Sequence, residues 1–106
     1  AVVVLDQGLH VRIWSEKAED FWGLRREEAV GQPFTDLDIG LPVRELDGPL
    51  RDALTGKAEQ QVTLDGVNRR GRTTRFQVRC TPLTNRKGVE GVVVLAEEAD
   101  QASDAF

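Results

Sequence analysis

Two short runs near the ends of the chain are apolar without alternation. Val2–Leu5 and Val92–Leu95 contain only valine and leucine. Strands that are apolar on both faces are typical of interior positions in a sheet. We therefore expect both runs to form central strands, and one face of these strands to expose an apolar stripe unless another element covers it.

The residues after the first run predict a turn, a strand and a short helix. Residues 6–8 have turn chemistry, and residues 10–14 alternate polar and apolar for most of their length. Ser15 can cap a helix that Gly23 ends, since serine accepts from free amides and glycine adopts the left-handed conformation. The apolar face of this helix consists of Ala18, Phe21 and Trp22.

The middle third predicts several short helical pieces and no long helix. Phe34 follows a proline and is expected in the core. The expected elements are a helical turn at 27–30 stopped by Gly31, a turn at 36–39 capped by Thr35, and a helix from Pro49 to Gly56. Such pieces cover a sheet and do not form a bundle.

The last third predicts three strands. They span residues 60–67, 72–82 and 89–97, joined by turns at 68–71 and 84–88. In the second of these strands, Phe76, Val78 and Cys80 share one face, opposite the face that carries Arg75, Gln77 and Arg79. The core is therefore expected to receive Cys80.

The order of elements predicts an α+β fold. Two strands, three short helices and three strands (β-β-α-α-α-β-β-β) favour a five-stranded antiparallel sheet with the helices on one face. A chain of 106 residues suffices for one domain. We expect that domain at 1–98, followed at 99–106 by a polar tail or the start of a connector.

Composition narrows the classes of partner. The net charge of −4 argues against nucleic acid and against an anionic membrane surface. One cysteine cannot form an internal disulfide, and no apolar run approaches the roughly 20 residues of a membrane span. Without a signal-peptide pattern, we expect a cytoplasmic protein. Because the chain starts without methionine inside a strand, we expect it to be part of a longer polypeptide.

Several local patterns, in this order, resemble a PAS domain over residues 2–97. They are the Asp6-x-Gly8 turn, the run Ser15-x-x-Ala18-x-x-Phe21-x-Gly23, the run Glu28-x-x-Gly31-x-Pro33-Phe34, the segment from Asn68 to Pro82 with its Arg70-Gly71 hairpin, and Gly91 opening the last strand. The resemblance implies a sensory or interaction module of a signalling protein.

A narrower likeness concerns residues 37–43. This run is similar to PAS domains found C-terminally in hybrid proteins built around chemotaxis-type methyltransferases. The chain departs from the family at Ser15, where PAS domains usually have Asn, and at residues 97–99, where they usually have Asp-Ile-Thr. The second departure bears on how a signal would leave the domain.

The resemblance also implies which residues each known type of PAS cofactor would require. A haem-binding PAS domain needs a histidine in the helical segment, which residues 43–56 lack, and His10 lies on a strand as a structural or solvated residue. A flavin photosensor needs a reactive cysteine in a helical motif, whereas Cys80 lies on a strand and is read as a small buried side chain. The tyrosine-dependent chromophore pocket is excluded because the chain has no Tyr. We expect no haem or flavin, and an unidentified small molecule stays open.

No pattern predicts an enzyme. Asp36 and Asp38 are close in sequence, but an acidic pair in a loop is more often a cap or a solvated turn than an acid–base couple. Hydrolase, phosphate-loop and zinc signatures are missing. A group of arginines is expected to solvate a hairpin and to pair with acidic residues on adjoining strands. We favour this interpretation over an anion-binding site. The group comprises Arg69, Arg70, Arg72, Arg75 and Arg79.

Two functional hypotheses follow. The first is a small-molecule sensor with a pocket between sheet and helices, and its alternative is that the same side chains simply fill the core. The expected lining is Trp22, Phe34, Leu41, Phe76 and Cys80. The second is a dimerisation module that uses the outer sheet face, which a flanking helix could cover instead. The expected contacts are Val3, Leu5, Val93 and Leu95.

Overall fold

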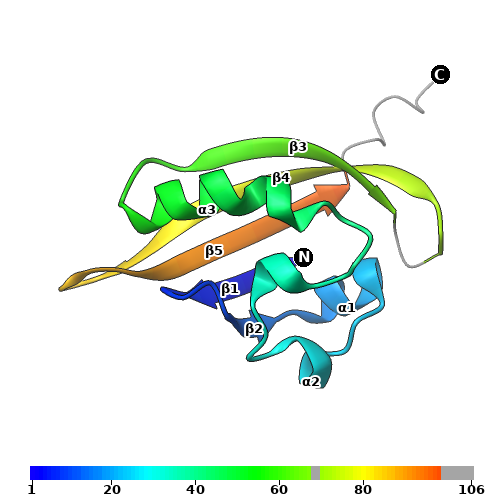
Figure 1. Ribbon diagram of the computed structural model, residues 1–106, viewed down its shortest axis with the longest axis horizontal. Helices are drawn as coiled ribbons and strands as arrows, with labels where there is room; N and C mark the ends of the chain where they lie inside the picture. The colour runs from blue at the N-terminus through cyan, green and yellow to red at the C-terminus, as the bar shows by residue number, and fades with distance from the viewer. Residues whose placement is uncertain (68–69, 99–106) are drawn as a thin grey trace.

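The computed structural model describes residues 1–67 and 70–98 and contains one antiparallel sheet of five strands. Its order is β2-β1-β5-β4-β3, so β5 is central and β1 is interior (Figure 1). The strands are β1 Val2–Asp6, β2 Val11–Trp14, β3 Gln60–Val67, β4 Thr73–Asn85 and β5 Gly88–Glu98. The predicted fold class and the interior position of both all-apolar runs are confirmed.

Short helices cover one face of this sheet. They are α1 Glu16–Trp22, α2 Arg26–Ala29 and α3 Asp47–Leu54, with 3₁₀ turns η1 Phe34–Asp36 and η2 Val43–Leu46. In Figure 1, α3 crosses in front of β4 and β5, while α2 lies beyond β2 at the opposite edge of the sheet from β3. The segment between β2 and β3 thus forms the second layer.

Local capping explains α1. The Ser15 hydroxyl accepts from the Ala18 amide at 3.2 Å and also from the Val2 amide at 2.9 Å, so it caps the helix and ties it to β1. Gly23 has φ 70° and donates its amide to the Glu19 carbonyl at 2.8 Å. Only glycine takes this conformation without a Cβ penalty, so both predicted ends of α1 are confirmed.

Several boundaries differ from the expectation. α3 begins at Asp47 and not at Pro49, because η2 runs directly into it and a proline in the first turn loses no helical hydrogen bond. The 3₁₀ turn starts at Phe34 and not at Asp36. β4 continues past Pro82 to Asn85, because β3 ends its pairing at Cys80 and leaves Pro82 with β5 as its strand partner.

A β-bulge changes the faces of β2. Val4 pairs with Ile13, but the next residue of β1 pairs with Val11, so Arg12 is the extra residue. Val11 and Trp14 therefore both face the core, whereas Ile13 is 54% exposed. Simple alternation along residues 10–14 would have placed Val11 and Ile13 on the same face.

The core lies between the sheet and the helical layer. The burial of side chains shows which residues of β1 point into it. Val3 and Leu5 are 0% and 1% exposed and pair with the buried Val94 and Val92. Their prediction as members of the outer face is therefore wrong. The reason is that an all-apolar run carries no alternation, so its sequence alone cannot show which of its two faces is buried.

Candidate functional site

Four aromatic rings meet at one end of the core. Trp14 comes from β2, Phe21 and Trp22 from the last turn of α1, and Phe76 from β4. Ring centroids lie 5.4 Å apart for Trp14 and Trp22 and 6.0 Å apart for Trp22 and Phe76. Phe21 lies 5.9 Å from Trp22 and 5.6 Å from Phe76. We refer to these four residues as the aromatic cluster.

The two indole N–H groups of this cluster have different environments. Trp14 Nε1 donates to the Leu24 carbonyl at 2.8 Å. Trp22 is 7% exposed, and its Nε1 is buried without a hydrogen-bond partner among the described residues. A buried donor without an acceptor is uncommon and is energetically unfavourable, so Trp22 stands out in an otherwise apolar core.

The five predicted lining residues all belong to the same core. Trp22, Phe34, Leu41, Phe76 and Cys80 are each at most 7% exposed, and Trp22 and Phe76 are in ring contact. Leu41 is positioned by a loop whose Gly40 carbonyl accepts from the Val67 amide at 2.7 Å. A pocket lined by these residues stays a prediction.

The thiol of Cys80 is fully buried on β4. Burial raises its pKa from 9.0 to about 11, because the thiolate would lose its hydration. The nucleophilic thiolate is therefore a very minor form near neutral pH. This environment supports the reading of Cys80 as a small apolar side chain.

His10 lies at the surface beside Asp6. Its side chain is 48% exposed, and Nδ1 is 3.6 Å from Asp6 Oδ1. The same carboxylate oxygen accepts from the amides of Gly8 and His10 at 2.9 Å and 3.0 Å. These bonds, led by the one from His10, lower the pKa of Asp6. The group closes the turn between β1 and β2, in keeping with the structural reading of His10.

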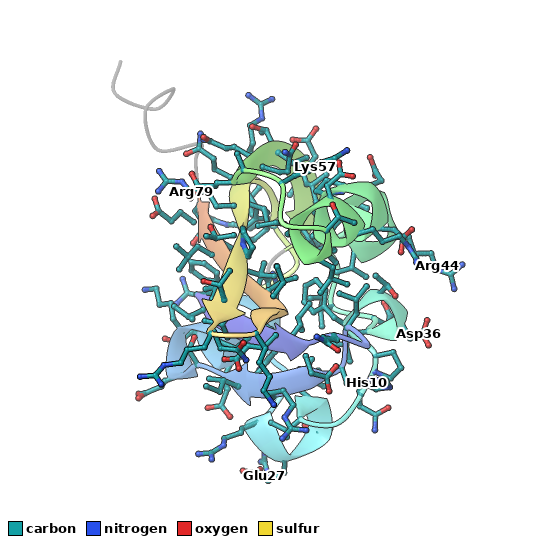
Figure 2. All side chains as sticks on the ribbon, turned by 90° about the vertical axis from the view of Figure 1, so that its left-hand side faces the viewer. His10, Glu27, Asp36, Arg44, Lys57 and Arg79 are labelled. Carbon is teal, nitrogen blue, oxygen red and sulfur yellow. The ribbon has the colours of Figure 1, made fainter. Side chains whose placement is uncertain are left out.

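An open depression of about 410 Å³ lies elsewhere on the surface. It is lined by Thr35, Asp36, Arg44 and Asp47, so it includes none of the predicted lining residues. Asp36 and Arg44 project on the same side of the molecule, the side of the helical layer (Figure 2). Asp38 is exposed and is not among the lining residues. The depression contains no buried polar side chain that would hold a ligand.

The arginines of the β3–β4 hairpin lie along exposed positions. Arg75 Nε is 3.3 Å from Asp65 Oδ1 on the paired position of β3, which agrees with the predicted cross-strand pairing. Arg79 is exposed and projects from the sheet side opposite to Asp36 and Arg44 (Figure 2). Arg69 lies outside the described residues.

The other face of the sheet carries an apolar patch. Its residues come from three neighbouring strands, with Ile13 and Val4 paired across β2–β1, and Val4 and Val93 paired across β1–β5. Ile13 and Val2 are 54% and 37% exposed, and the others are half-buried. We call this set the outer apolar face: Val2, Val4, Ile13, Val93 and Leu95.

Val93 and Leu95 therefore lie where the sequence predicted them. Val2, Val4 and Ile13 were missed as members of this face. The expected stripe along β1 and β5 was the signal for Val2 and Val4, but Ile13 depends on the bulge in β2, for which the sequence has no signal.

The described residues contain no group of three or more His, Cys, Asp or Glu side chains that could hold a metal ion. Among the helices in the described part of the chain, none combines the length and apolar character that crossing a bilayer requires.

Comparison with solved structures identifies the fold. A PAS domain of a Colwellia psychrerythraea protein is 19% identical, with 93% of this chain and 85% of that chain covered and a TM-score of 0.75. The PAS domain of the histidine kinase ThkA is 23% identical, with 92% and 96% covered and a TM-score of 0.73.

A third similar protein is VqmA, of which this chain spans about half. A structure of VqmA bound to DPO is 14% identical, with 93% of this chain and 52% of that chain covered and a TM-score of 0.78. A Vibrio cholerae VqmA dimer is 14% identical, with 95% and 48% covered and a TM-score of 0.79.

Curated protein sequences contain no match to this chain. None of these comparisons addresses the likeness to chemotaxis methyltransferase hybrids, which stays a prediction. A family model described as PAS fold matches residues 1–104. Together with the β2-β1-β5-β4-β3 sheet and its helical layer, this match shows that the chain belongs to the PAS fold family.

Proposed function

We propose that this chain is a signalling module that self-associates through the outer apolar face. PAS domains are sensory and signalling modules, and one of the similar structures is a PAS domain of a histidine kinase. The observation that carries the proposal is the continuous row Ile13–Val4–Val93 across three strands, with Val2 and Leu95 beside it.

Leaving this row of side chains in contact with water is energetically unfavourable. Single exposed apolar side chains are ordinary, whereas a contiguous apolar patch on a sheet marks an interaction surface. A second copy of the chain offers the same patch, so a two-fold interface would cover both at once. The dimer named among the VqmA structures is a fold-level parallel only.

Sedimentation velocity over a concentration series tests this proposal. We expect the wild-type chain to shift from monomer to dimer as concentration rises, and we expect Ile13→Glu and Val93→Glu to stay monomeric. A buried like-charge pair at a two-fold interface opposes association, because each copy would bring an unpaired carboxylate into the contact.

The matched control is Val30→Glu. Val30 is 40% exposed at the end of α2, away from the outer apolar face, so its replacement should leave self-association unchanged. Amide NMR spectra would confirm that each variant is folded. A wild-type chain that stays monomeric at the highest concentration, or a dimer unaffected by both strand variants, would rule the proposal out.

A second candidate function is small-molecule sensing within the core. The observation that favours it is the unpartnered Trp22 Nε1 inside the aromatic cluster. VqmA, which shares the fold, has been seen bound to DPO. The alternative is a core filled entirely by its own side chains, with self-association as the only function.

The wider context forms part of the same proposal. We assign no catalytic step to these residues, and any enzymatic output would belong to a covalently linked signalling domain. We propose a cytoplasmic setting without nucleic-acid or membrane partners. The net charge of −4 supports that choice, since both of those surfaces are anionic.

A further inference from the structure

We infer that the sensing site takes a small uncharged molecule with a hydrogen-bond acceptor, and that Trp22 Nε1 is the group that recognises this acceptor. The inference rests on the small-molecule sensing proposed above and adds the chemical class of the ligand and the recognising atom. Its starting point is the one buried side-chain donor without a partner among the described residues.

The unpartnered donor specifies what the ligand must carry. An indole nitrogen only donates, so its partner must be an acceptor such as a carbonyl, ether or hydroxyl oxygen. Trp14 shows that the same fold can satisfy an indole, since its Nε1 donates to the Leu24 carbonyl at 2.8 Å. The Trp22 ring lies 5.4 Å from that of Trp14, and its Nε1 has no equivalent carbonyl among the described residues.

The surroundings specify the charge of the ligand. Every described buried residue is apolar except Thr74, which is 5% exposed and donates its hydroxyl to Glu98 at 3.2 Å. An ion placed beside Trp22 would therefore lose its hydration without meeting a buried opposite charge, since Lys17, whose Nζ lies 5.4 Å from the Phe21 ring, is exposed to solvent. Recognition favours an uncharged molecule whose apolar part contacts the rings of the aromatic cluster.

Phe21 marks the side from which such a molecule would enter. Its ring contacts both Trp22 and Phe76, yet the side chain is only half-buried, and Lys17 Nζ lies 5.4 Å from its centroid. A rotation of Phe21 would open the cluster without moving a strand. The other three rings are more deeply buried, each at most 7% exposed.

The experiment uses three probes of similar shape. Acetophenone has an aromatic ring and a neutral acceptor, ethylbenzene lacks the acceptor, and benzoate is charged. Each is titrated to about 10 mM, the range in which a fragment of this size binds. The readout is the indole N–H region of a ¹H–¹⁵N spectrum, where the two tryptophans report separately and Trp14 serves as an internal reference.

We expect acetophenone to shift the Trp22 Nε1–H resonance downfield and saturably, while the Trp14 resonance changes little. Acetophenone should bind about three to ten times more tightly than ethylbenzene, the ratio of one neutral hydrogen bond. Benzoate should produce no saturable shift. In Trp22→Phe the preference for acetophenone over ethylbenzene should disappear, while the ring contacts still admit both.

Other results would overturn the inference. Equal binding of acetophenone and ethylbenzene in the cluster, without a downfield shift of Trp22 Nε1–H, would leave sensing in place but remove the recognition role of Trp22. Binding of benzoate alone would contradict the uncharged class. A long-lived water at Trp22 Nε1, with none of the probes bound, would remove both this inference and the sensing proposal.

Discussion

At the scale of single residues, Trp14 and Trp22 show how identical side chains acquire different roles. Both are buried and lie 5.4 Å apart, but one indole donates to a carbonyl and the other does not. Their difference is set by what the neighbouring backbone offers. The chain turns after α1 so that the Leu24 carbonyl meets Trp14, and this turn brings no acceptor to Trp22.

This difference predicts that replacing each tryptophan by phenylalanine lowers the free energy of unfolding by different amounts. Trp14→Phe and Trp22→Phe remove the same atoms, but only the first leaves a carbonyl without its donor. We expect Trp14→Phe to lower the free energy of unfolding by about 1 kcal/mol more than Trp22→Phe. Urea unfolding followed by circular dichroism measures both; equal losses would show that the bond to Leu24 contributes nothing.

Some residues suggest a reactive site by their type alone, although their surroundings in the structure do not support one. Cys80, His10 and Asp36 are the residue types from which reactive sites are built. The structure places Cys80 in an apolar environment that disfavours the thiolate, and His10 in a turn that it shares with Asp6. Residue type indicates what a group can do, whereas its surroundings decide whether it does so.

At the scale of elements, β1 and β5 approach each other so closely that one position between them has no room for a side chain. Gly91 on β5 pairs with Asp6, and a Cβ at this position would collide with the backbone carbonyl of Leu5. The close approach of these two strands therefore depends on the missing side chain. The same pair carries Val4 and Val93, so its geometry also positions the outer apolar face.

We expect Gly91→Ala to destabilise the chain by about 1 to 3 kcal/mol, because strand backbones must separate to admit the methyl group. Gly48→Ala is the matched control, since that glycine lies in α3 with nothing within 4 Å of the added Cβ. It should cost less than Gly91→Ala, because the only neighbour that its Cβ would crowd is the ring of Pro49, which disfavours a helical residue with a side chain before it. Thermal unfolding compares the two; a Gly91→Ala variant as stable as wild type would contradict the close approach.

The element scale also shows how much of the fold the sequence could predict. Both ends of α1 were predictable because Ser15 and Gly23 act within one or two turns of their own positions. The start of α3 and the end of β4 were not, because they depend on η2 and on the length of β3. Boundaries set by a neighbouring element have no local signal.

At the scale of the whole molecule, stability at low pH depends partly on the β1–β2 turn. The Asp6 pKa is lowered from 3.8, first because the His10 amide donates to it and further because the Gly8 amide and nearby cationic groups favour the carboxylate. A carboxyl with a lowered folded-state pKa stabilises the fold above pH 3.8, and this contribution is lost as the pH falls through the lowered pKa.

We therefore expect Asp6→Asn to unfold with a weaker dependence on pH than wild type below about pH 5. Asparagine can still accept from both amides, so the comparison isolates the charge. Asp38→Asn, at an exposed loop position, should keep the wild-type dependence. Urea midpoints measured at several pH values test this, and parallel curves for Asp6→Asn and wild type would count against it.

The two proposed functions of the molecule lie on opposite sides of the sheet. The inner side carries the aromatic cluster, in which Trp22 would recognise an acceptor. The outer side carries the apolar row through which two copies would associate. Since β1 and β5 contribute to both sides, a change in the inner layer could reach the interface through one pair of strands. This arrangement is suited to a module that converts binding into association.

Sequence alone determined the order of the elements, the interior positions of β1 and β5, the caps of α1 and the resemblance to PAS domains. Each of these rests on local chemistry or on hydropathy along a few residues. Only the tertiary structure decided that Val3 and Leu5 face the core, that Ile13 faces outward, and that Trp22 finds no acceptor among the described residues. An all-apolar strand has no period to reveal its faces, and a hydrogen-bond partner is supplied by backbone that folding brings near.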